Sequence, residues 1–167
     1  PMTTWPVPLQ KLAEADAVTG ATPLGLFSKG YIDQIPSNMD TFLGFIGGSL
    51  GETSAIALLI GGIYLIIRKV IEPTIPVAFI GTVAVISLIA GQDIVFQICA
   101  GGVMLGAFFM ATDYATSPIS TKGKIIFGIG CGFLTMIIRL FGSYPEGVSF
   151  SILFMNILTP HIDNLCM

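Results

Sequence analysis

Residues 42–67 read FLGFIGGSLGETSAIALLIGGIYLII, and the single charged residue in this run is Glu52. An α-helix rises 1.5 Å per residue, so about 20 apolar residues are enough to cross the hydrocarbon core of a bilayer. A run of this length and polarity is typical of a membrane-spanning helix. The rest of the chain is organised around runs of the same kind.

Four further apolar segments follow the first one. They are Ile75–Ala90, Ile94–Thr112, Ile125–Ile138 and Val148–Ile162. The fourth of the five segments is short for a span, but Lys124 and Arg139 at its ends can snorkel toward the membrane surface. We therefore predict an all-α membrane protein, in which residues 42–167 form about five transmembrane helices. Residues 1–41 are polar and interrupted by prolines, and we predict an extramembrane segment there.

Composition supports a membrane protein and excludes several functions. Hydrophobic residues make up 53% of the 167 residues, and charged residues only 10%, against about 25% in ordinary soluble domains. The net charge of -3 provides no basic surface for nucleic acid. Cys99, Cys131 and Cys166 form no Cys-x-x-Cys pair, so we expect structural cysteines rather than a zinc or iron–sulfur site. His161 is expected to be a helix-end residue rather than a metal ligand.

The basic residues between the spans predict the orientation of the chain. Arg68 and Lys69 follow the first span, and Lys122 and Lys124 precede the fourth, so both pairs fall on one side of the membrane. The positive-inside rule places that side in the cytoplasm. Residues 1–41 are then outside, and the C-terminus is cytoplasmic.

The extramembrane segment contains the polar stretch DAVTGATP at residues 16–23. Gly20 can adopt a positive φ and Ala21 adds little bulk, so a pyrophosphate donor can approach the hydroxyl of Thr22. In that interpretation Asp16 orients the loop or binds a metal for the modifying enzyme. In the alternative interpretation, Asp16 caps a turn while Thr19 and Thr22 satisfy backbone groups.

Two of the acidic residues in or beside the predicted spans are candidates for function. Glu52 follows a Gly-rich stretch in the first segment, and an acidic residue near the hydrophobic zone is a candidate for an ion or cofactor pathway. The alternative for Glu52 is a capping role at the start of a helix. Asp113 ends the third segment, where its hydroxyl and aromatic neighbours can line a cofactor or quinone pocket. The alternative there is a helix end followed by a proline turn.

Five stretches of the chain stand in the order found in a known family. They are DAVTGAT at 16–22, GETS at 51–54, GAFFMATD at 106–113, FGSYPEGVSF at 141–150 and NILTPHID at 156–163. Nearly the whole chain thereby resembles the RnfD and NqrB family. Its members are the flavin-bearing membrane subunits of the Rnf complex and of the sodium-pumping NADH:quinone oxidoreductase.

The resemblance implies an electron-transfer subunit of an ion-translocating ferredoxin:NAD⁺ oxidoreductase in the bacterial inner membrane. It implies FMN joined to Thr22 by a phosphoester, with Asp16, Thr19, Gly20 and Ala21 completing the attachment loop. A flavin transferase would install the FMN outside the cytoplasm. The expected partners are the other Rnf subunits, including a second subunit with covalent FMN, and the lipid bilayer.

Family members usually have ten spans in two related five-helix halves, and the resemblance places this chain in the second half. A complete ion path, and a riboflavin-type site between the halves, would then belong to a longer protein. The start at Pro1 rather than at Met is also expected of part of a longer protein.

Two other functions remain open on the sequence. A secondary transporter or channel fragment fits the Gly-rich helices and Glu52, but it leaves the stretch at residues 16–22 unexplained. A structural membrane subunit without a cofactor is the third hypothesis. The sequence shows no ligand set that distinguishes Na⁺ from H⁺, because backbone carbonyls can serve an ion path.

Overall fold

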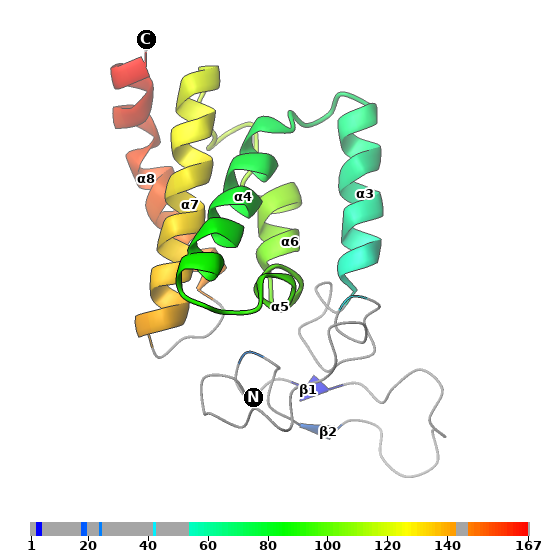
Figure 1. The fold of residues 1–167 in the computed structure, drawn as a ribbon. Helices are drawn as coiled ribbons and strands as arrows, with labels where there is room; N and C mark the ends of the chain where they lie inside the picture. Colours follow the sequence, from blue (N-terminus) through cyan, green and yellow to red (C-terminus); the bar gives the residue numbers. More distant parts are fainter. Residues whose placement is uncertain are drawn as a thin grey trace.

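The computed structural model describes residues 54–142 and 147–166, together with residues 3–4, 18–19, 24 and 42. This part of the chain is helical apart from one pair of two-residue strands (Figure 1). The elements are β1 Thr3–Thr4, β2 Val18–Thr19, α3 Ala55–Ile67, α4 Thr74–Ile89, α5 Ile94–Cys99, α6 Val103–Leu105, the π-helix η2 Gly106–Met110, α7 Thr121–Phe141 and α8 Val148–Cys166.

The helices form a bundle in which α7 lies between α4 and α8 (Figure 1). α4 packs along α7, α8 packs against α7 as well, and α3 joins the bundle through α6 and η2 (Figure 1). A buried apolar cluster fills the space between α4, α6, η2, α7 and α8. Its fully buried large side chains are Phe79, Val83, Val103, Phe127 and Met136. A second cluster around Met104 and Phe108 holds α3.

Glycine on α7 allows α4 to approach very closely. A Cβ atom added to Gly132 would lie 2.7 Å from the Thr82 Cβ and 2.8 Å from the Phe79 carbonyl oxygen. Gly128, one helical turn earlier, faces Ala78 in the same way. Lipid tails are as apolar as leucine, so helices in a membrane associate through close packing of this kind rather than through the hydrophobic effect.

The third apolar segment is not one helix, and the prediction of a continuous helix over Ile94–Thr112 is wrong. α5 ends at Cys99, Ala100 is extended with φ -83° and ψ 136°, and Gly101 has a φ of +68°. A positive φ is easily adopted by glycine and rarely by other residues, so the chain turns here. The helix resumes as α6 and continues into η2. Figure 1 shows α5 end-on and α6 upright, which makes the change of direction visible.

The other described segments are helices close to the predicted positions. α4 lies within one residue of its predicted bounds, whereas α7 and α8 are longer than predicted. The Ser120 hydroxyl caps α7 by accepting a hydrogen bond from the Gly123 N–H at 3.0 Å. In the first segment the structure describes Phe42 as helical and α3 from Ala55 onward; residues 43–53 lie outside the described residues.

By length and composition, α7 is the one helix of the described ranges that is long and apolar enough to cross a membrane alone. α3 and α4 are shorter apolar helices. The end of α8 lies at the opposite end of the bundle from β1 and β2 (Figure 1). Lys69 and Lys124 line one cleft, so the two predicted basic pairs do lie at the same end. Which side of the membrane this end faces stays a prediction.

The close contact between α4 and α7 predicts different effects for two glycine substitutions. Gly132→Ala should destabilise the bundle by about 1–3 kcal/mol, because the new methyl group meets the backbone of α4. Gly81→Ala is the matched control, since an added Cβ at this exposed position on α4 has no atom within 4 Å. Thermal unfolding in detergent measures both, and equal melting temperatures for the two variants would contradict the role of Gly132.

Candidate functional site

Most of the predicted attachment loop lies outside the described residues. This holds for Asp16, Gly20, Ala21 and Thr22, and also for Glu52. Thr19 is described as part of β2, which pairs antiparallel with β1 so that Thr19 lies opposite Thr3. The assignment of FMN to Thr22 therefore stays a prediction, as does an ion-pathway role for Glu52.

Leu24, two residues after Thr22, has a defined position on the helical bundle. Its side chain is 3% exposed and packs in a small cluster with Phe96 and Ala100. Phe96 belongs to α5, and Ala100 is the residue that ends it. Two peptide units span about 7 Å at most, so the stretch of chain that joins Thr22 to Leu24 is short.

α5 is only six residues long, and a charged side chain caps each of its ends. At the N-terminus, the Asp93 carboxylate accepts hydrogen bonds from the N–H groups of Val95 at 3.0 Å and Phe96 at 3.4 Å. At the C-terminus, the Arg139 guanidinium of α7 binds the carbonyl end of the helix. The anion and the cation therefore lie at the ends of the helix that the helix dipole favours.

Arg139 makes three hydrogen bonds at this helix end. Its Nη1 donates to the Gln97 carbonyl at 2.6 Å and to the Gln97 Oε1 at 2.9 Å, and its Nη2 donates to the Ala100 carbonyl at 3.0 Å. Gln97 is 2% exposed, and its side-chain amide also donates to the Oε1 of Gln92. Carbonyls left without partners at a buried helix end carry a free-energy cost, and the guanidinium removes it.

The structure therefore differs from the prediction that Arg139 snorkels toward the membrane surface. The side chain turns into the bundle, where the break in the third segment leaves carbonyls that need donors. The adjacent Gly101 and Gly102 were the only local sign of this break in the sequence. Nothing local in the sequence identifies Arg139 as the donor, because Gln97 lies 42 positions away.

The second candidate region surrounds Asp113 at the other end of the bundle. Asp113 is exposed, and its Oδ2 accepts a hydrogen bond from the Thr116 hydroxyl at 3.2 Å. Its neighbours line a cleft of about 190 Å³. The lining residues are Lys69, Val70, Ile71, Glu72, Ile75, Thr112, Tyr114, Ser117 and Lys124. Small-molecule sites usually occupy about 300–1,000 Å³, so this cleft is small for a whole cofactor.

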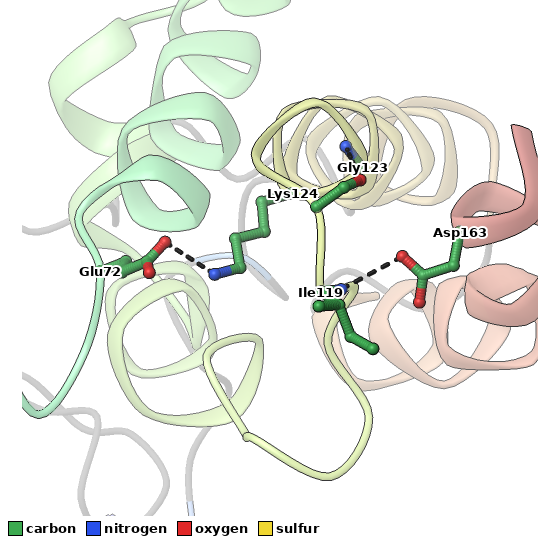
Figure 2. A network of polar contacts seen from close by, with 6 residues as sticks. Glu72, Ile119, Gly123, Lys124 and Asp163 are labelled. Carbon is green, nitrogen blue, oxygen red and sulfur yellow. Dashed lines mark hydrogen bonds and ion pairs between the residues drawn. The ribbon is translucent and has the colours of Figure 1, made fainter. Parts of the chain in front are cut away.

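Polar contacts fasten the elements around this cleft to one another (Figure 2). The Lys124 ammonium of α7 pairs with the Glu72 carboxylate at 2.7 Å, and the Ile119 N–H donates to the Asp163 carboxylate of α8 at 3.1 Å. The Thr159 hydroxyl of α8 donates to the Thr116 carbonyl at 3.0 Å. The loop that carries Asp113 is thus attached to α8 at two points.

The three cysteines and the histidine do not form a common site in the described part of the chain. Cys99 and Cys131 are buried, Cys166 is half-buried, and none of the three forms a disulfide. His161 lies exposed on α8. Within residues 54–142, 147–166 and the few described before them, no group of three His, Cys, Asp or Glu side chains could hold a metal ion.

The tether between α8 and the loop gives a prediction for two aspartates. Asp163→Ala should speed amide hydrogen exchange at Ile119 by roughly three- to tenfold, because the N–H loses a carboxylate acceptor. Asp113→Ala is the control, since its described bond stays within the loop. Exchange measured by NMR or mass spectrometry checks this, and an unchanged rate in Asp163→Ala would refute the tether.

Comparison with known proteins shows the family of this chain. The profile of the NQR2, RnfD, RnfE family matches residues 1–167. The chain is 55% identical to the D subunit of the Na⁺-translocating ferredoxin:NAD⁺ oxidoreductase complex of Acetobacterium woodii, over 89% of this chain and 47% of the relative.

Two further relatives extend the comparison. The chain is 47% identical to the D subunit of the proton-translocating ferredoxin:NAD⁺ oxidoreductase complex of Clostridium ljungdahlii, over 97% of this chain and 55% of the relative. It is 38% identical to the D subunit of the ion-translocating oxidoreductase complex of Stutzerimonas stutzeri, over 99% of this chain and 56% of the relative. The chain spans about half the length of these curated relatives. With a match over its whole length, the chain belongs to the NQR2, RnfD, RnfE family.

Proposed function

We propose that this chain is the flavin-bearing part of the D subunit in an ion-translocating ferredoxin:NAD⁺ oxidoreductase complex, with FMN joined to Thr22. The observation that carries the proposal is the stretch DAVTGAT at residues 16–22 in a chain 55% identical to one such D subunit and 47% identical to another. The complex would reside in the bacterial inner membrane. Its other subunits, including a second subunit with covalent FMN, would be the partners.

The chemistry at Thr22 is the formation of a phosphoester. The Thr22 hydroxyl oxygen would bond to the flavin-side phosphorus of a pyrophosphate donor as the P–O bond of the pyrophosphate breaks; the other half of the donor would leave as a phosphate monoester, and the hydroxyl proton would pass to the flavin transferase or to water. FMN, once bound, supplies one- and two-electron transfer. The task of the chain is to keep this group at a fixed place relative to the other redox centres of the complex.

The buried position of Leu24 supports a role of the chain in holding the flavin at a fixed place. Leu24 is buried against Phe96 and Ala100, so the segment is fixed to the bundle two residues after Thr22. The arrangement suits a group that must stay at one place during electron transfer. Residues 1–41 would lie outside, within reach of the transferase, and the C-terminus in the cytoplasm. The opposite placement of β1–β2 and the end of α8 is compatible with that orientation (Figure 1).

The coupling ion would be Na⁺ or H⁺, as the names of the two ferredoxin:NAD⁺ relatives differ in this respect. Glu52 is the candidate residue for ion access within the apolar region. Asp113 is a weaker candidate, because it is exposed at one end of the bundle. A riboflavin-type site would require the other half of the longer protein.

A transporter or channel fragment is favoured by one observation, the broken third segment. Broken helices in transporters bind ions through carbonyls freed at the break. In this chain the carbonyls of Gln97 and Ala100 already accept hydrogen bonds from Arg139, a fixed cation. The break is therefore filled by the protein itself, and the redox subunit is the function better supported.

Changing the acceptor hydroxyl tests the proposal. Thr22→Ala in the assembled complex should remove the covalent flavin, because no oxygen remains to form the phosphoester. Flavin fluorescence of the denatured chain in a gel, and the mass of the tryptic peptide 12–29, measure the result. Electron flow from ferredoxin to NAD⁺ should fall with the flavin.

The matched control is Ser28→Ala, which removes a hydroxyl from the same peptide but lies outside the stretch at residues 16–22. This variant should keep the flavin mass on peptide 12–29. The assignment would be overturned if Thr22→Ala retained the flavin, or if the chain without any substitution carried none. The remaining hypotheses would then be a transporter or channel fragment and a membrane subunit without a cofactor.

A further inference from the structure

We propose that Arg139 is a positioning residue for the chain at Leu24, two residues after the proposed flavin acceptor Thr22, and that it acts through α5. The inference rests on the proposed function for its purpose, because it concerns the segment that would carry the flavin. The contacts that support it belong to the described residues and involve no flavin. It assigns to a residue near the end of α7 control over the position of a segment more than a hundred residues earlier in the chain.

The first step is the set of hydrogen bonds that Arg139 donates to the end of α5. A six-residue helix is too short to be stable by itself, so its position depends on its contacts. The planar guanidinium reaches two carbonyls and one side-chain oxygen at the end of α5, at 2.6–3.0 Å. Charge-assisted hydrogen bonds of this kind are roughly twice as strong as neutral ones.

The second step is the contact between α5 and Leu24. Ala100 connects the two steps, because its carbonyl accepts a hydrogen bond from Arg139 while its side chain belongs to the buried cluster that contains Leu24 and Phe96. Ala100 is 0% exposed, which leaves little room for it to move independently. Displacing the Ala100 carbonyl therefore displaces the surface on which Leu24 rests.

The third step separates this role from general stability. Leu24, Phe96 and Ala100 form a cluster of their own, distinct from the core between α4, α7 and α8. The contact between α4 and α7 depends instead on the close approach at Gly128 and Gly132. Loss of the guanidinium should therefore loosen α5 and the Leu24 segment, and leave the rest of the bundle in place.

Hydrogen–deuterium exchange in the assembled complex, embedded in lipid nanodiscs, tests the proposal. Arg139→Gln should speed exchange in peptides covering residues 20–28 and 94–101 by about tenfold or more. Exchange in α4, α7 and α8 should change little. Arg139→Lys should restore part of the protection, because an ammonium keeps the charge but lacks the planar fork. Arg68→Gln, an exposed arginine at the other end of the bundle, should leave both peptides unchanged.

A double substitution tests whether Arg139 acts through Leu24. Leu24→Ala alone should also speed exchange over residues 20–28. If both residues belong to one chain of contacts, combining it with Arg139→Gln should add little to the effect of the larger single change. The proposal would be overturned if the effects of the two substitutions on the exchange rate multiplied in the double variant. It would also be overturned if Arg139→Gln sped exchange throughout α4, α7 and α8, or left exchange over residues 20–28 unchanged.

Repeating the exchange experiment in the Thr22→Ala background separates the two proposals. If Thr22→Ala keeps its flavin but Arg139→Gln still loosens residues 20–28, the flavin assignment fails and the positioning role stands. If Thr22→Ala loses its flavin but Arg139→Gln leaves exchange over these residues unchanged, only the positioning role fails.

If the Arg139→Gln protein does not accumulate, Arg139→Lys is measured instead. Partly faster exchange over residues 20–28 in Arg139→Lys would support the proposal, and unchanged exchange would overturn it.

Discussion

The hydrogen bonds between the Arg139 guanidinium and the carbonyl end of α5 remove two free-energy costs, that of unpaired carbonyls and that of an unpaired buried cation. A helix that stops inside a bundle leaves backbone carbonyls without partners, and a membrane offers no water to satisfy them. A guanidinium inside the same bundle is costly unless it is paired. Each group supplies what the other lacks. The chain can therefore turn at residues 100–102, and the path of α5, α6 and η2 follows from that turn.

Around this break, close helix packing and single hydrogen bonds both hold the bundle together. α4 and α7 meet at Gly128 and Gly132, with backbone atoms where side chains would otherwise separate them. α8 covers α7 and holds the loop before α7 through Asp163 and Thr159. α5 contacts this frame through apolar side chains, among them Ile98 and Cys99, and through the hydrogen bonds that Arg139 donates.

The sequence predicted the helices well and the break poorly, for one physical reason. Apolar runs locate helices in a membrane because every backbone group must be paired there, and α4 lies within one residue of the prediction. Hydropathy stays apolar across Cys99 to Met104, so it does not reveal where the axis turns. The hydrogen bonds of Arg139 to α5 and the packing of Leu24 with Phe96 and Ala100 are contacts between residues far apart in the sequence, so no local pattern predicts them. The motif at residues 16–22 predicts chemistry at Thr22, which lies outside the described residues.

The distance in sequence between Arg139 and α5 also sets an order for the assembly of the bundle. A ribosome makes the chain from its N-terminus, so α5 is synthesised about forty residues before the side chain that completes its carbonyl end. Until α7 has been made, the carbonyls of Gln97 and Ala100 lack the guanidinium that they bind in the finished bundle. The surface beneath Leu24 is therefore among the later parts to be completed. A nascent chain that stops before Arg139 contains every residue of that surface, but lacks the group that holds it in place.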